Sequence, residues 1–146
     1  MQPRTVCLRD VADEDLPIFY QHQSDIEAAH MAGFTSREFP AFLAHWAKIR
    51  ADPGNLLQTI VVDGQTAGNI VSFWMGEDRE VGYWLGREYW GQGITSEALQ
   101  LFLQVDLIRP LWARALKSNV ASIRVLEKGG FQYTGQDGEE VILKRA

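Results

Sequence analysis

The chain has 146 residues, with 14 Lys and Arg against 19 Asp and Glu, so its formal net charge is −5. This length favours one domain over residues 1–146 and suffices for a hydrophobic core without disulfide or metal staples. A hydrophobic fraction of 46% and a charged fraction of 23% exclude an intrinsically disordered chain. The acidic balance makes nucleic acid a poor partner, because contacts with phosphates supply most of that affinity.

We expect neither a targeting segment nor a metal-binding motif in this sequence. No apolar run is long enough for a membrane span, and residues 1–5 lack the apolar segment of a signal peptide. Cys7 is the only cysteine, so no internal disulfide can form and we expect a cytoplasmic protein. We expect Cys7 to be a small apolar residue buried in the core. The three histidines lack metal-ligand spacing, so we expect no metal site. The chain is compatible with a monomer or a homodimer.

The first part of the chain predicts one strand and two helices. Val6–Val11 has the composition of a strand, and a helix follows over 14–23. Asp13 and Asp15 stand at its start, where carboxylates accept hydrogen bonds from free N–H groups. Apolar residues at helical spacing predict a second helix from Ser36, as N-cap, to Ala51.

The middle of the chain predicts three strands joined by tight turns. Gln58–Val62 and Thr66–Met75 flank Asp63-Gly64, a pair typical of the type I′ hairpin turn. A further strand is expected over Glu80–Leu85.

The last third alternates helices and strands before a closing hairpin. The expected elements are a helix over Thr95–Leu107, a strand over Leu111–Lys117, a helix ending at Lys128 before Gly129-Gly130, and strands over Phe131–Thr134 and Val141–Lys144. Hairpins early in the chain and strand–helix–strand units later predict a mixed α/β sheet.

Two glycines one residue apart, Gly91 and Gly93, lie between a strand and a helix. Glycine permits positive φ and close approach of a ligand, and a helix start offers unpaired N–H groups and a positive dipole end. The segment therefore predicts a phosphate site, unless the glycines only make a tight turn. The dinucleotide fingerprint would need a third glycine at Ser96, and the mononucleotide loop would need Gly-Lys-Ser/Thr, so neither motif is matched.

Three segments carry a family resemblance. They read Gly-Tyr-Trp-Leu from residue 82, Glu-Tyr-Trp-Gly-Gln-Gly-Ile-Thr-Ser-Glu-Ala-Leu from residue 88, and Asn-Val-Ala-Ser-Ile-Arg-Val-Leu-Glu-Lys-Gly-Gly-Phe from residue 119. Together they resemble the GCN5-related N-acetyltransferase (GNAT) superfamily, and within it the Rim-type N-terminal acetyltransferases of ribosomal proteins. The resemblance implies a GNAT-like fold: a strongly twisted mixed sheet of about seven strands with helices on both faces.

The resemblance also implies a binding site for acetyl-CoA. The pantetheine arm would insert beside the backbone of Tyr83, Trp84 and Leu85 and bond Asn119, for which a helix N-cap is the alternative role. The diphosphate would rest on the backbone amides of Trp90, Gly91, Gln92, Gly93, Ile94, Thr95 and Ser96. The hydroxyls of the last two residues would assist.

Catalytic roles follow from the same resemblance. Many members carry a general-acid tyrosine where this chain has Leu126, so Ser122 would substitute as acid, unless it is only a small packing residue. The backbone N–H near Leu85 would stabilise the oxyanion. Glu80 would be the general base; its alternative is a solvated turn residue, with water-mediated proton removal instead.

The implied activity is an acetyl-CoA-dependent N-acetyltransferase that acts on a primary amine by direct attack. The acceptor, a small molecule or a protein N-terminus, stays open. Two other readings remain: a non-catalytic acyl-CoA-binding module of the same fold, and an enzyme that binds a nicotinamide dinucleotide.

Overall fold

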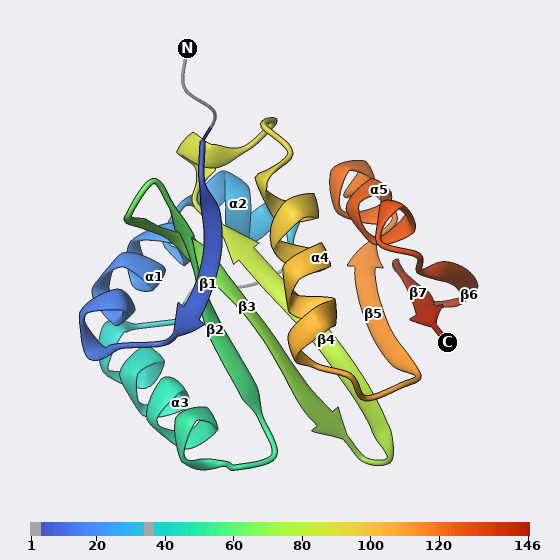
Figure 1. The fold of residues 1–146 in the computed structure, drawn as a ribbon, viewed down its shortest axis with the longest axis horizontal. Coiled ribbons are helices and arrows are strands. Elements are labelled where there is room, and N and C mark those ends of the chain that lie inside the picture. Colours follow the sequence, from blue (N-terminus) through green and yellow to red (C-terminus); the bar gives the residue numbers. More distant parts are fainter. Residues whose placement is uncertain (1–3, 34–36) are drawn as a thin grey trace.

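The computed structural model of the chain describes residues 4–33 and 37–146. One mixed sheet runs in the strand order β1-β2-β3-β4-β5-β7-β6, and among the strand pairs of the described residues only β4–β5 is parallel (Figure 1). The strands are β1 (Val6–Asp10), β2 (Leu56–Val62), β3 (Gln65–Met75), β4 (Asp78–Leu85), β5 (Leu111–Leu116), β6 (Gln132–Asp137) and β7 (Glu140–Arg145). The helices are η1 (Asp13–Asp15), α1 (Leu16–Gln23), α2 (Ile26–Met31), α3 (Phe39–Ala51), η2 (Arg87–Tyr89), α4 (Ile94–Val105) and α5 (Val120–Lys128). The predicted mixed α/β architecture is confirmed.

Helices cover both faces of the sheet, with α4 and α5 on one face and α1 to α3 on the other (Figure 1). The larger core lies under α4, where Leu99 and Phe102 are fully buried among residues of the central strands. A smaller core lies under α1 and α3, where the rings of Phe19 and Trp46 are 5.2 Å apart. The central strands are therefore fixed from both sides.

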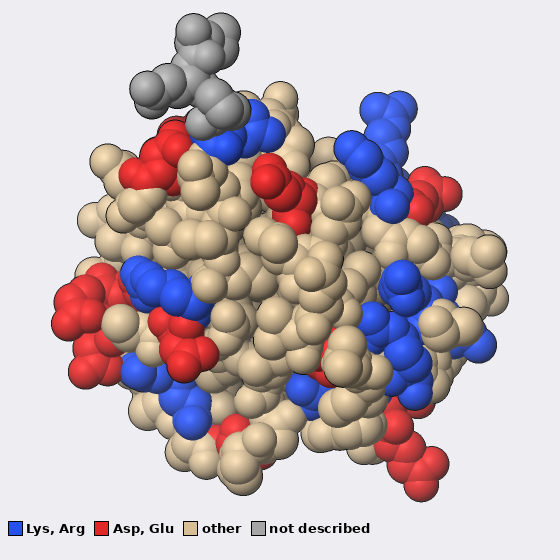
Figure 2. All heavy atoms as spheres, viewed as in Figure 1, with Lys and Arg blue, Asp and Glu red and all other residues tan. Residues whose placement is uncertain are grey.

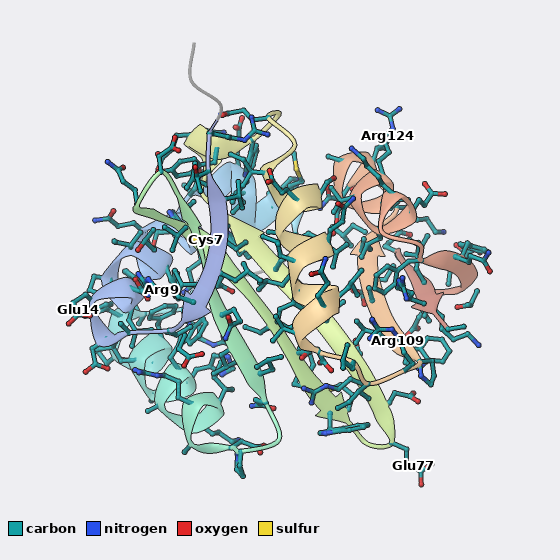
Figure 3. The ribbon with its side chains drawn as sticks, in the orientation of Figure 1. Cys7, Arg9, Glu14, Glu77, Arg109 and Arg124 are labelled. Atoms are coloured by element: carbon teal, nitrogen blue, oxygen red, sulfur yellow. The ribbon has the colours of Figure 1, made fainter. Side chains whose placement is uncertain are left out.

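The predicted hairpin turn is present. Asp63 (φ 50°) and Gly64 (φ 81°) both adopt positive φ, as a type I′ turn requires. On β1, side chains alternate: Val6 faces the larger core, whereas Cys7 points to solvent (Figure 3). The expectation that Cys7 is buried is therefore wrong.

The helices differ from prediction at the N-terminal side. Helix α2 was not predicted, because six residues are too few to show a periodic pattern. Asp25 caps it by accepting hydrogen bonds from two backbone amides. Helix α3 begins at Phe39, and the expected N-cap, Ser36, lies outside the described residues.

Asp15 does not cap α1 as expected; it is a buried hub. Its carboxylate accepts two hydrogen bonds from Arg9 (2.7 and 2.8 Å), one from the Ala12 amide (2.9 Å) and one each from the hydroxyls of Thr59 (2.7 Å) and Thr66 (2.9 Å). Burial raises the pKa of Asp15, but these hydrogen bonds together outweigh it and hold the pKa well below its usual range. Asp15 thereby ties the first helical segment to β1, β2 and β3.

Asp15→Asn is expected to lower the free energy of unfolding by about 2–3 kcal/mol at neutral pH, because buried donors lose a charged partner. The native pKa lies below the unfolded value of about 3.9, so this stabilisation is present above that pH and is lost as pH falls. Urea unfolding of both proteins from neutral to acidic pH should show a shrinking difference; a constant difference would contradict the assignment. Asp13→Asn, at an exposed ion pair with Arg50, is the control and should change stability by under about 1 kcal/mol.

Among the described residues, no helix is long and apolar enough to cross a membrane. In the same part of the chain, no group of three or more His, Cys, Asp or Glu is arranged to hold a metal ion. Figure 2 shows that the face over β1 and α4 is largely uncharged at its centre, with charged side chains mostly towards its edges.

Candidate active site

Strands β4 and β5 separate in the middle of the sheet. They pair only through Arg79 with Leu111 and Glu80 with Trp112. Beyond this point, β4 remains paired with β3 as far as Leu85. The edge of β4 that faces β5 is therefore left open, as a strand-like ligand would require.

The backbone of β4 presents alternate residues to this opening. Gly86 N–H donates to the Ala67 carbonyl of β3 (2.8 Å), which sets the phase of the antiparallel ladder. By alternation, Trp84 directs its N–H and C=O towards β3, whereas Tyr83 and Leu85 direct theirs towards β5. Two of the three expected backbone contacts thus face the opening, and the Trp84 backbone does not.

A cavity of about 350 Å³ occupies the opening between β4, α4 and α5. The expected cofactor residues that line it are Tyr83, Trp84, Leu85, Trp90, Gly91, Gly93, Ile94, Thr95, Ser96, Asn119 and Ser122. Gln92 and Glu80 do not line it. The structure therefore gathers most of the predicted cofactor residues around one space, although they come from three separate segments.

The glycine loop at one end of the cavity presents backbone donors. Gly91 (φ 74°) and Gly93 (φ 76°) both adopt the left-handed conformation. Gly93 is the N-cap of α4, and its carbonyl accepts the hydrogen bond of Glu97 N–H at 3.2 Å. The amides of Thr95 and Ser96 precede that bond, so this end of α4 has the features of an anion site.

Side chains of the loop hold it in place. Trp90 Nε1 donates to the Leu85 carbonyl at 2.9 Å. Gln92 Nε2 donates to the Glu88 carbonyl at 3.0 Å, and the Gln92 carbonyl accepts a hydrogen bond from the Arg4 guanidinium. Gln92 thus braces the loop, which explains why it does not line the cavity.

At the other end of the cavity, polar groups of Asn119 and Ser122 at the start of α5 lie near the hydroxyl of Tyr83 on β4. Asn119 Oδ1 accepts from the Ser122 amide at 3.3 Å, so Asn119 does cap the helix. The Tyr83 hydroxyl lies 2.8 Å from Ser122 Oγ. Burial raises the pKa of Tyr83 to about 12, against the opposing effect of the Ser122 hydrogen bond. Leu126 is buried in the core and offers no acid.

Glu80 lies on the opposite face of β4 from Tyr83, at the end where β4 and β5 still pair. Its side chain is 15% exposed and lies 3.8 Å from Arg114. Burial raises the pKa of Glu80, and Asp78 and Glu140 add to this effect while Arg114 opposes it. Glu80 is thus a sheltered carboxylate, not a fully solvated turn residue.

Open space lies beside Glu80 on the same face of β4. Gly82 is the next residue on that face, and a Cβ added there would meet no atom within 4 Å. Glu80 is three residues from Tyr83, about 10 Å along the strand. An acceptor would therefore have room over Gly82, between Glu80 and the opening.

Helix α2 forms a wall of the cavity that the sequence did not predict. Ala28, Met31 and Ala32 line the cavity from this segment. Arg87, just before the glycine loop, forms ion pairs with Asp25 (3.4 Å) and with Glu27 of α2. The wall and the loop are thereby linked, which no local pattern in the sequence could have shown.

A family model for an acetyltransferase (GNAT) domain matches residues 5–132. No curated protein matches the chain significantly by sequence. Solved structures share its fold at low identity. The aminoglycoside acetyltransferase AAC(6′)-Ib in complex with coenzyme A and kanamycin is 15% identical, with 97% of this chain and 95% of that chain covered and a TM-score of 0.82.

Two further structures show the same similarity. A domain from Methanocaldococcus jannaschii DSM 2661 is 18% identical, with 97% and 98% of the two chains covered and a TM-score of 0.82. A GNAT-family acetyltransferase from Bacillus anthracis is 16% identical, with 95% and 93% covered and a TM-score of 0.79. The family match spans most of the chain and includes β4, the glycine loop and α5; the chain belongs to the GNAT acetyltransferase family.

Proposed function

We propose that this protein is an acetyl-CoA-dependent N-acetyltransferase that acetylates a primary amine. The observation that carries the proposal is the cavity beside the open edge of β4, between β4, α4 and α5, with the amides of the glycine loop at one end. Acetyl-CoA, when bound, supplies an activated acetyl thioester. The remaining chemistry would come from the residues around the cavity.

Different groups around the cavity match successive parts of acetyl-CoA. The diphosphate is an anion, and the amides of Thr95 and Ser96 at the start of α4 would bind it. The pantetheine arm contains amide groups, which match the open backbone edge at Tyr83 and Leu85, where the Leu85 carbonyl already accepts one hydrogen bond from Trp90 Nε1. Because Asn119 uses Oδ1 to cap α5, its Nδ2 is the group that would donate to the arm.

Three groups would assist the transfer of the acetyl group. The Leu85 N–H, directed into the opening, would donate to the developing oxyanion. The Ser122 hydroxyl would donate to the leaving sulfur, which is only mildly basic because a thiol has a pKa of about 8.5. Glu80 would accept the proton of the amine through water over Gly82, and burial raises its pKa, which makes its carboxylate a stronger base than an exposed one.

For the acceptor we propose a small-molecule amine. The solved relative that binds kanamycin supports this class, and the room over Gly82 supports entry from the Glu80 side. The resemblance to the Rim-type branch favours a protein N-terminus instead. A panel of aminoglycosides, polyamines, amino acids and short peptides separates the two classes. Acetylation of each amine is measured by the release of free thiol from acetyl-CoA.

Acetyl-CoA at about 100 times its dissociation constant is expected to raise the free energy of unfolding by ~2.7 kcal/mol. NADH at the same concentration should leave stability unchanged. Thermal and urea unfolding with each ligand measure this. Stabilisation by NADH alone would contradict the proposal, whereas stabilisation by acetyl-CoA with no acetylation of any amine would identify a non-catalytic acyl-CoA-binding module.

A further inference from the structure

The hydroxyls of Tyr83 and Ser122 meet at the cavity although the two residues are 39 positions apart in the sequence. Tyr83 comes from β4 and Ser122 from the first turn of α5, and both line the cavity. Their oxygen atoms are 2.8 Å apart. The pair therefore bridges the two sides of the opening at the level where β4 and β5 have separated.

The direction of this hydrogen bond follows from its geometry and acidity. The Tyr83 hydroxyl has one hydrogen and two oxygens of Ser122 within reach, Oγ at 2.8 Å and the carbonyl at 3.3 Å. Hydrogen bonds between two oxygens are usually about 2.5–3.0 Å long, so Oγ is the better acceptor. A phenol, with a pKa of about 10, is also a stronger acid than an aliphatic alcohol, so distance and acidity both favour Tyr83 as the donor and Ser122 as the acceptor, although either oxygen could donate.

This arrangement leaves the hydrogen of the Ser122 hydroxyl to be used elsewhere. Within residues 4–33 and 37–146, Ser122 Oγ has no second hydrogen-bond partner, not even the carbonyl one turn earlier that helical serines often use. Since Ser122 borders the cavity, its O–H can turn towards bound ligand. Burial keeps Tyr83 protonated, with its pKa raised to about 12, so the arrangement persists across the working pH range.

We propose that Tyr83 is a positioning residue, whose hydroxyl donates to Ser122 Oγ and so directs the Ser122 O–H at the sulfur of coenzyme A. The inference rests on the proposed function. During transfer the acetyl C–N bond forms and the C–S bond breaks, and sulfur keeps the electron pair. The hydrogen bond from Ser122 stabilises that thiolate, while the proton lost by the amine goes to Glu80 or water. No other reactant is needed.

The pH dependence of coenzyme A binding tests this without turnover. A thiolate that is stabilised in the complex has a lowered pKa, so affinity rises with pH through the range around the free thiol pKa of about 8.5. Desulfo-coenzyme A, which lacks the sulfur, corrects for every other titrating group. In calorimetric titrations, the affinity for coenzyme A relative to desulfo-coenzyme A should rise about tenfold, as expected for one hydrogen bond to a charged group.

Three variants complete the experiment. Ser122→Ala should abolish this rise, and Tyr83→Phe should abolish most of it, each rise being measured against the same variant's own affinity for desulfo-coenzyme A. The double variant should resemble Ser122→Ala alone, because the two hydroxyls act as one unit. In the acetylation assay, kcat should likewise fall most in Ser122→Ala and in the double variant, and somewhat less in Tyr83→Phe.

Several outcomes would overturn the inference. A wild-type rise in Tyr83→Phe would remove Tyr83 from the role, and so would independent, additive losses in the double variant. If Tyr83→Phe does not fold, Ser122→Ala still decides, because a full rise in that variant excludes Ser122 as the donor. A wild-type protein that binds neither ligand would instead refute the proposed function. A wild-type protein that binds coenzyme A and desulfo-coenzyme A and acetylates amines, but shows no rise of relative affinity with pH, would refute only this inference.

Discussion

Gly91→Glu is expected to weaken coenzyme A binding by more than about 100-fold. Gly91 lines the cavity, and a Cβ there would meet no protein atom within 4 Å, so a longer side chain has room beside the proposed diphosphate site. Its carboxylate would then stand close to the diphosphate. At about 4 Å and an effective dielectric constant near 20, two like charges repel by about 4 kcal/mol, which exceeds the energy of a 100-fold loss. Calorimetry with coenzyme A measures the change.

Gly91→Gln is the matched control, because glutamine has nearly the same size and no charge. Both variants place a side chain at φ 74°, which is strained by about 1–2 kcal/mol for a residue with a Cβ. The difference between them therefore isolates charge, and it should shrink at high salt. Wild-type affinity in Gly91→Glu, or equal losses in both variants, would show that the loop does not bind the diphosphate.

Most of the sheet was predictable because its signals are local. Asp63-Gly64 has the residues that a type I′ turn requires, and it sets the register of β2 and β3 next to the turn, up to the bulge at Ile60/Val61. Helix α2 and the role of Asp15 were not predictable in this way. The helix has only six residues, and two partners of Asp15, Thr59 and Thr66, lie 44 and 51 positions away in the sequence.

The candidate site also has features that the sequence predicts and features that depend on tertiary structure. The glycine loop was recognisable because a strand, two glycines and a helix start follow one another directly, and both glycines adopt positive φ. The pairing of Tyr83 with Ser122 depends on how α5 is placed across the opening. Which backbone groups of β4 face β5 depends on its register with β3, so the orientation of Trp84 could not be read from the strand alone.

Glu80→Gln is expected to lower kcat about 100-fold or more near neutral pH, because a positioned general base contributes at least that much. The raised pKa of Glu80 means that its carboxylate is lost on acidification earlier than for an exposed glutamate. Wild-type kcat/KM should therefore fall as pH drops through that raised pKa. In the variant this step disappears, and the rate instead rises steeply with pH, up to tenfold per unit, as the fraction of neutral amine increases.

Binding and neighbouring charge provide the controls for Glu80. Its side chain does not line the cavity, so Glu80→Gln should bind coenzyme A as the wild type does. Asp78→Asn removes an exposed carboxylate of the same strand that raises the pKa of Glu80, so it should move the acid limb of the wild-type profile to lower pH without abolishing it. Kinetics of Glu80→Gln that match the wild type at every pH would exclude Glu80 as the base. The amine would then lose its proton to water before it reaches the space over Gly82.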